Sequence, residues 1–230
     1  MMKTGYPVLA GLLAASAAAP LLAQQNTVRI GISNVQPHSS TSDFAGPFTA
    51  SGISIEVRDK TTPFISFTRE INDQWDLELA LGVPPTHDIG LKVNNASLPA
   101  SAQALSGQVG ARVRQVAPTL FANYKFLEKT SAFRPFVGIG INYTRFDNTS
   151  SNAVGNALNG GATSISLEDS VGLALQGGVV YRFNELWSLS AALATAQVKS
   201  KITTNTLGIE RSADIRFKPQ VFTVAVGYSF

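Results

Sequence analysis

Residues 221–230 read VFTVAVGYSF, and their side chains alternate between two kinds. One set of alternate positions is bulky and apolar, and the other set is mostly small. A period of two places alternate side chains on opposite faces of a β-strand. The segment therefore predicts a two-faced strand at the end of the chain, whose bulky face consists of Phe222, Val224, Val226, Tyr228 and Phe230.

Earlier segments repeat this alternation. In residues 187–194, Trp187, Leu189 and Leu193 alternate with serine and alanine. The further segments are 171–183, 137–144, 116–126 and 75–82, with weaker matches at 61–70 and 27–35. Together with the C-terminal stretch, they predict an all-β fold, an eight-stranded antiparallel transmembrane β-barrel.

The connections between these segments alternate in length. Three are short, at residues 72–74, 127–134 and 184–186, and four are long, at residues 36–60, 84–114, 147–169 and 200–216. Short periplasmic turns and long extracellular loops are typical of outer-membrane barrels. This pattern predicts that both ends of the mature chain lie on the periplasmic side.

The start of the chain predicts export. Lys3 precedes an apolar run over residues 8–19, and Ala23 leads into a polar stretch, as in a cleaved secretory signal peptide. We therefore expect a signal peptide at residues 1–23 and one barrel domain at residues 24–230. Beyond the leader, no stretch reaches the roughly 18 consecutive apolar residues of a membrane helix.

Composition excludes several functions. Charged residues make up 14% of the chain and the net charge is +3, so no nucleic-acid partner is expected. The absence of cysteine excludes disulfides, thiolate metal sites and cysteine nucleophiles.

Periodicity alone fits either a soluble barrel or a membrane barrel. Two features favour a bulky face toward lipid. The small face is rich in glycine, alanine and serine, as suits a narrow lumen. Aromatic residues also gather at the strand ends beside short turns, as in the aromatic girdle of a membrane barrel. They are Trp75, Tyr124, Phe126, Phe183, Trp187, Tyr228 and Phe230. We therefore expect the protein in the outer membrane of a Gram-negative bacterium, with lipid as a partner.

Charged residues on the small face lie close to the short turns. Unpaired charges in a narrow interior are costly, so the pattern predicts a compensated charge cluster near the periplasmic mouth. The alternative is that these residues contact water at the mouth without pairing. The residues concerned are Arg29, Asp76, Glu78, Lys125 and Arg182.

Four stretches carry a family resemblance. They are Ser42–Gly46, Thr86–Ile89, Arg134–Thr144 and Leu167–Ser170. On these residues the chain resembles the outer membrane protein W (OmpW) family from about residue 26 to residue 230. The resemblance implies a barrel whose loops and upper lumen form a hydrophobic conduit, through which small apolar molecules cross the outer membrane passively, like a porin for hydrophobic solutes.

The C-terminal strand has a second interpretation. A final Phe230 preceded by apolar residues at alternate positions looks like the signal that the barrel-assembly machinery recognises. We expect Phe222, Val224, Val226, Tyr228 and Phe230 to form this assembly signal. The alternative is an ordinary amphipathic last strand.

Catalytic chemistry is not expected. The two histidines, His38 and His87, fall in long connections without a cluster of further ligands, so no metal and no cofactor is predicted. His38, Ser39 and Asp43 could form an acyl-transfer site only if they met within hydrogen-bond reach, which proximity in a loop does not establish. We predict no enzyme.

Two functions remain open. The first is a conduit for small hydrophobic molecules, and the alternative is a structural or surface-interaction barrel with a closed lumen and partner-binding loops. For the conduit, Pro118 is a candidate lateral weak point, because proline cannot donate to the strand ladder. An apolar funnel at the outer mouth, or else an upward continuation of the first strands, is predicted at Phe44, Phe48, Ile53 and Ile55.

Overall fold

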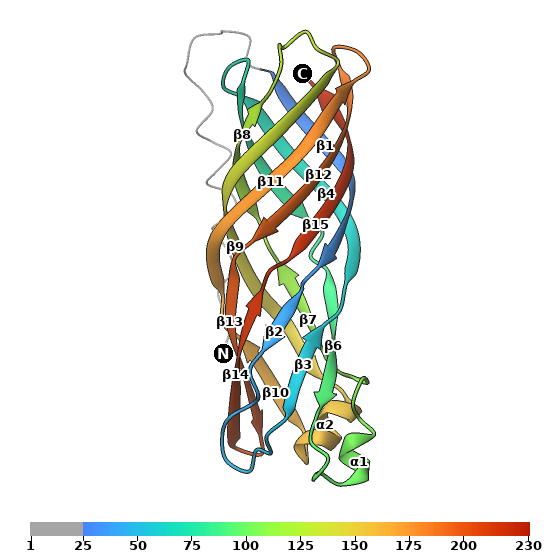
Figure 1. Ribbon diagram of the computed structural model, residues 1–230, viewed down its shortest axis with the longest axis vertical. Coiled ribbons are helices and arrows are strands. Elements are labelled where there is room, and N and C mark those ends of the chain that lie inside the picture. Colours follow the sequence, from blue (N-terminus) through green and yellow to red (C-terminus); the bar gives the residue numbers. More distant parts are fainter. Residues whose placement is uncertain (1–24) are drawn as a thin grey trace, which may run out of the picture.

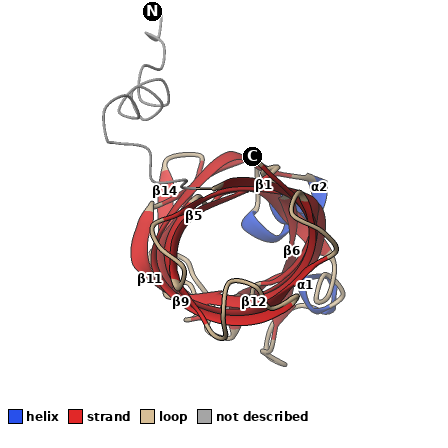
Figure 2. Ribbon diagram, turned by 90° about the horizontal axis from the view of Figure 1, so that it is seen from above, coloured by secondary structure: helices blue, strands red, loops and turns tan. Residues whose placement is uncertain are grey.

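The computed structural model describes residues 25–230, so the predicted signal peptide at residues 1–23 lies outside the described residues. Eight antiparallel strands close into a barrel, as predicted, with each strand paired to two neighbours (Figure 1). Seen along its axis the barrel is a complete ring, closed by pairing between the fifth and sixth of these strands (Figure 2). The eight are β1 (Asn26–Gln36), β4 (Lys60–Glu70), β5 (Trp75–Gly82), β8 (Thr119–Lys125), β9 (Phe133–Ser151), β11 (Ser170–Arg182), β12 (Trp187–Ala196) and β15 (Gln220–Ser229).

The first and last strands meet at a tight seam. Asn26 and Phe230 exchange backbone hydrogen bonds of 3.0 and 2.9 Å, so every backbone group there finds a partner, as lipid requires. Inside the seam, Gly31 lies so close to β15 that an added Cβ would sit 2.0 Å from the carbonyl oxygen of Val224. Only glycine allows this approach of the two backbones.

The bulky faces of the strands point outward. Trp187 and Phe222 are 47% and 53% exposed, whereas Ser188, Ser190 and Thr223, at alternating positions, are buried. This confirms that the large apolar side chains face the membrane and the small ones face the interior.

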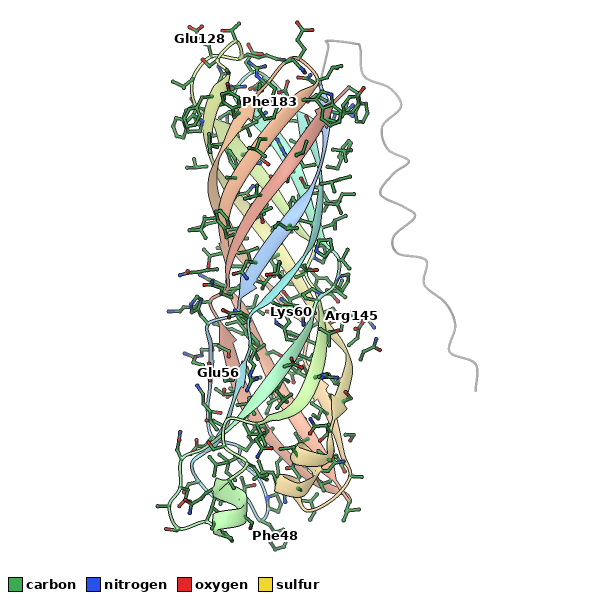
Figure 3. The ribbon with its side chains drawn as sticks, turned by 90° about the vertical axis from the view of Figure 1, so that its right-hand side faces the viewer. Phe48, Glu56, Lys60, Glu128, Arg145 and Phe183 are labelled. Carbon is green, nitrogen blue, oxygen red and sulfur yellow. The ribbon has the colours of Figure 1, made fainter. Side chains whose placement is uncertain are left out.

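Aromatic pairs mark one end of the barrel, which we call the short-turn end because the three short connections lie there. Trp75 packs edge-on against Tyr124 across β5 and β8, with ring centroids 5.3 Å apart. Trp187 packs in the same way against Tyr228, at 5.1 Å. Phe183 lies at the same level (Figure 3). These rings form a girdle where the apolar band ends.

The four long connections were expected to be loops, and that expectation was wrong in part. They contain strands that continue the barrel beyond the apolar band, and β9 runs through both levels (Figure 1). We call this part the extension. Its strands are β2 (Ser39–Thr41), β3 (Ile53–Val57), β6 (Thr86–Val93), β7 (Val109–Val116), β10 (Thr163–Leu167), β13 (Val198–Thr206) and β14 (Ile209–Phe217).

The physical reason is a reversal of faces. In the extension, apolar residues such as Ile89, Ile202 and Ile215 point inward and are almost fully buried. Charged residues such as Lys92 and Arg112 point outward. An outer surface in water is polar, so a pattern sought as apolar-outward strands misses these segments. Lys60 and Arg145, about halfway along the molecule, mark the change of level (Figure 3).

Two short helices cover the far end of the extension, which we call the loop end. They are α1 (Ala100–Gln103) and α2 (Ala153–Asn159). Asn152 caps α2 by accepting hydrogen bonds from the backbone N–H groups of Val154 and Gly155. Within residues 25–230, no helix is long and apolar enough to cross a membrane.

Candidate functional site

Three cavities lined by residues of the described part of the chain follow one another along the axis. The largest, about 160 Å³, lies in the membrane barrel and is called the lumen cavity. A cavity of about 100 Å³ near the loop end is called the outer cavity. Between them lies a space of about 20 Å³, the constriction. The constriction shares Val35, Gln115, Val198 and Pro219 with the lumen cavity and Ile89 with the outer cavity, which places it between the two.

Ion pairs lie inside the barrel near the short-turn end. Arg29 Nη1 lies 3.3 Å from Glu78 Oε1 and also donates to the Thr68 hydroxyl. Lys125 Nζ lies 2.9 Å from Asp76 Oδ2 and 3.2 Å from Glu70 Oε1. The side chains of Arg29, Glu78 and Asp76 are each less than one tenth exposed. We call this layer the charged floor.

Two amides join the ion pairs of the charged floor. Asn123 Nδ2 donates to Asp76 Oδ1 at 2.8 Å and to Glu78 Oε2 at 3.1 Å. Gln176 Nε2 donates to Glu78 Oε2 at 2.9 Å and to Asn123 Oδ1 at 2.7 Å. The sequence prediction included only charged residues and missed these two. Both residues lie on the inward face of their strands in the sequence pattern, and this position could have identified them as members of the floor.

Arg182 differs from the prediction. Its guanidinium donates to the backbone carbonyls of Lys129 and Ser131, and it takes part in none of the ion pairs between residues 25 and 230. The reason is its place near the end of β11, where the turn carbonyls are closer than the floor carboxylates. Arg134 has a similar role, since it donates to the carbonyl of Asp73 at 2.6 Å. These arginines secure turns rather than bridge the lumen.

The outer cavity is lined mainly by apolar side chains, with a few polar groups such as Asn159, Thr204 and Arg211. Phe44, Phe48, Ile53 and Ile55, the residues predicted for a funnel, all line it. Ile53 and Ile55 belong to β3, whereas Phe48 is 88% exposed at the rim (Figure 3). Deeper inside, the cavity meets a cluster of buried apolar side chains that fills the extension. The cluster includes Val57, Ile89, Leu91, Val113, Ile202, Ile215 and Phe217.

The barrel wall is weakly paired where β5 passes into β6 and β7 into β8. Pairing of β5 with β8 ends at Ala80 and Thr119, and pairing of β6 with β7 resumes at Thr86 and Arg114. Across the stretch between, one backbone hydrogen bond is found among the described residues, from Gln115 N to the carbonyl of Pro85 at 2.9 Å. We call this stretch, residues 81–85 and 115–118, the wall gap.

Prolines explain the wall gap. Pro84, Pro85 and Pro118 lie in it, and proline has no N–H to donate to a neighbouring strand. The carbonyl of Pro118 still accepts a hydrogen bond from Tyr143 N on the β9 side, at 3.1 Å. Leu81, Gly82, Pro85, Gln115 and Ala117 line the lumen cavity, so that cavity reaches the gap.

The residues weighed for acyl transfer have structural contacts. His38 is exposed, Ser39 Oγ accepts from Val57 N at 3.1 Å, and Asp43 Oδ2 accepts from Gly52 N at 2.7 Å. In the described part of the chain, no three potential metal ligands gather at one place.

Comparison with known proteins agrees with this architecture. The sequence profile described as the OmpW family matches residues 24–230. Outer membrane protein W of Vibrio cholerae serotype O1 is 31% identical over 222 residues, covering 95% of this chain and 96% of that protein. The dibenzothiophene metabolism operon protein PahQ of Pseudomonas aeruginosa is 26% identical over 216 residues, or 93% of each protein.

A solved structure shows the same fold. The crystal structure of the outer membrane protein OprG from Pseudomonas aeruginosa superimposes with a TM-score of 0.77 at 28% identity. The match covers 90% of this chain and 95% of OprG.

Proposed function

Because the chain belongs to the OmpW family, whose members are non-enzymatic outer-membrane barrels, we propose that it is a passive conduit for small hydrophobic molecules. The observation that supports this function best is the contrast between the two halves of the interior. The extension has an apolar interior, whereas the membrane barrel ends in the charged floor. A hydrophobic molecule can enter from outside but meets charge on the direct route to the periplasm.

The free energies of apolar burial and of ion-pair breaking favour entry from the loop end. An apolar solute gains roughly 25 cal/mol for each Å² removed from water, so hiding about 200 Å² in the extension stabilises it by about 5 kcal/mol. Breaking a buried ion pair costs about 3–5 kcal/mol, and the charged floor contains several linked pairs. A passive solute therefore does not leave through the floor.

The wall gap offers another exit. There the lumen cavity meets a part of the wall held by few backbone hydrogen bonds, and lipid lies on the other side. We propose that solutes move from the outer cavity through the constriction to the wall gap, and then pass sideways into the membrane. Pro118 is the proposed lateral weak point.

The relatives support the choice of substrate class. PahQ is named for an operon of dibenzothiophene metabolism, and dibenzothiophene is a hydrophobic aromatic compound. A conduit for such compounds suits the apolar lining of the extension.

Uptake measurements separate the conduit from the alternative, a structural or surface-interaction barrel whose loops bind partners while the lumen stays closed. Radiolabelled naphthalene and glucose are offered to cells with and without the protein. The conduit predicts faster uptake of naphthalene when the protein is present and no change for glucose. Equal naphthalene uptake in both cells would leave only the scaffold function.

A substitution tests the lateral exit. Pro118→Val supplies the missing N–H donor on the β9 side, where the Pro118 carbonyl already accepts from Tyr143 N, and is expected to hold this edge of the wall gap more firmly, so naphthalene uptake should fall. Pro99→Val serves as the control, because Pro99 is exposed at the loop end, outside the wall gap. Unchanged uptake with Pro118→Val would count against a role for this residue.

We also propose that the barrel-assembly machinery recognises the last strand. Phe222, Val226, Tyr228 and Phe230 lie on its outward face and are 41–61% exposed, while Val224 is half-buried. Phe230→Ser should lower the amount of folded protein in the outer membrane. Leu207→Ser, at an 80% exposed turn of the extension, should not.

A further inference from the structure

A histidine is buried in the constriction of the proposed route. His87, the second residue of β6, is 1% exposed and lines the constriction. Apart from Gln115, its neighbours there are apolar, among them Val113, Phe146 and Phe217. Burying a polar ring among apolar side chains costs free energy unless the ring is hydrogen-bonded. The function proposed above assigns no role to this residue.

The hydrogen bond on one side of the ring fixes its tautomer. His87 Nδ1 lies 2.8 Å from the carbonyl oxygen of Arg58. A carbonyl can only accept, so Nδ1 carries the proton and donates. In the neutral imidazole Nε2 then has no proton and is a hydrogen-bond acceptor.

The other side of the ring is unsatisfied. Nε2 is buried and has no hydrogen-bond partner within the described part of the chain. The donors of Arg58 point elsewhere, because its side chain donates to the carbonyl of Gly107 at 2.6 Å and its backbone N–H to the carbonyl of Asp88. A native structure leaves a buried acceptor without a partner only rarely, so Nε2 points to a donor supplied from outside the chain.

Gln115 provides a second polar group. Its side chain lines both the constriction and the lumen cavity. Its side chain interacts with the His87 ring and raises the pKa of His87, yet Nε2 has no hydrogen bond of good geometry to any described residue. A carboxamide offers a donor and an acceptor. A hydroxyl between these two side chains could therefore donate to Nε2 and accept from the Gln115 amide.

We propose that His87 and Gln115 form a hydroxyl-binding site in the constriction, which favours hydrophobic solutes that carry a hydroxyl group over those that do not. This inference rests on the proposed conduit function. The site lies directly above the wall gap, because Pro85 and Gln115 belong to that gap and His87 follows Pro85 by two residues. A solute is thus selected immediately before its exit.

The site depends on a neutral imidazole. Burial lowers the pKa of His87, and Lys60 lowers it further, whereas the Arg58 carbonyl, Gln115 and Asp59 act in the opposite direction. Asp59 comes from the connection between β3 and β4, and Lys60 is the first residue of β4. The residues that line the constriction from β9, β13 and β14 are uncharged. Once protonated, Nε2 donates and no longer accepts the solute proton.

Paired solutes test the proposal. Naphthalene and 2-naphthol differ by one hydroxyl, and their uptake is measured in cells that contain equal amounts of folded wild type, His87→Phe, Gln115→Leu or His38→Gln. Loss of one buried hydrogen bond predicts that the 2-naphthol to naphthalene uptake ratio falls about threefold to tenfold in His87→Phe. Gln115→Leu should lower the ratio as well. His38→Gln, at the other histidine, should keep the wild-type ratio.

A pH profile distinguishes binding from a merely structural role. Acidification should lower the ratio in the wild type as His87 gains a proton, while the ratio of His87→Phe should stay low and flat. If both solutes need the protein but the ratio is the same in wild type and His87→Phe, the hydroxyl site is wrong and the conduit stands. If neither solute needs the protein, the conduit and the hydroxyl site are both wrong.

Discussion

Lys125 shows how a single residue stabilises the charged floor of the lumen. Its ammonium lies between Asp76 and Glu70, and Asp76 is only 2% exposed. A buried carboxylate without its cation is strongly destabilising, whereas the intact pair contributes little. The charged floor is therefore stable only as a complete network, because removal of one charge leaves its partner buried and unpaired.

Lys125→Met should lower the free energy of unfolding by about 3–5 kcal/mol, because it leaves Asp76 buried and uncompensated. Urea unfolding in lipid vesicles measures this change, and adding Asp76→Asn should recover most of it. Lys92→Met is the matched control, because the Lys92–Glu56 pair is about half exposed and its loss should change the value by about 0.5 kcal/mol or less. Equal effects of the two lysine substitutions would contradict the floor as described.

His87 predicts a pH dependence of stability. Its pKa in the folded state lies below its ordinary value of about 6.5, chiefly because the ring is buried. As the pH falls below about 6.5, the unfolded chain takes up a proton that the folded protein resists, so the free energy of unfolding decreases.

The loss should begin near pH 6.5 and continue until the folded pKa is passed. Urea midpoints between about pH 7.5 and 5 should therefore decline less in His87→Gln than in the wild type or in His38→Gln. Identical slopes in all three proteins would show that His87 titrates as it does in the unfolded chain.

The sequence predicted the floor in part. Asp76, Glu78 and Lys125 were identified because alternation gives the face of a charge and the nearby turn gives its height. Which charges pair was not predictable, since pairing depends on the register between strands far apart in the chain. Arg182 illustrates this limit, because it has the right face and level but reaches the turn carbonyls instead.

Among the elements, the β1–β15 seam is sensitive to side-chain size. Gly31→Val places a side chain against the backbone of β15, where a Cβ alone meets Val224 O at 2.0 Å. Overpacking of this kind costs about 1–3 kcal/mol or more, so the variant should unfold at lower urea or fail to close. Gly177→Ala is the control, since its Cβ would meet nothing closer than Phe136 O at 3.7 Å. A Gly31→Val barrel as stable as the control would show that the seam can open to make room.

The extension shows why some strands are harder to find than others. Strands in the lipid zone expose bulky residues and enclose small ones, and this contrast identified all eight membrane strands. The strands of the extension stand in water and reverse the two faces, so segments such as 86–93 and 209–217 were expected to be loops. Their apolar positions also alternate, but with the opposite orientation.

At the scale of the whole molecule, the membrane barrel and the extension share one axis and have opposite polarity. The membrane barrel is apolar outside and polar within, and the extension is charged outside and apolar within. The junction between them coincides with the prolines of the wall gap and with His87. At this level the apolar face of the wall changes from the inner side to the outer side. We infer that a solute therefore stays in apolar surroundings as it moves from the extension into lipid.

Isotope-labelled isoleucine methyl groups test this central claim most directly, because isoleucines lie on both sides of the wall. Ile55, Ile89, Ile202 and Ile215 face the interior of the extension, and Ile30, Ile32, Ile139 and Ile141 face lipid. With the protein in lipid nanodiscs, naphthalene is added and the methyl NMR shifts are followed. The interior conduit predicts saturable shifts at the first four methyl groups, while the lipid-facing four change only weakly and without saturation. Shifts confined to the lipid-facing methyl groups would contradict it.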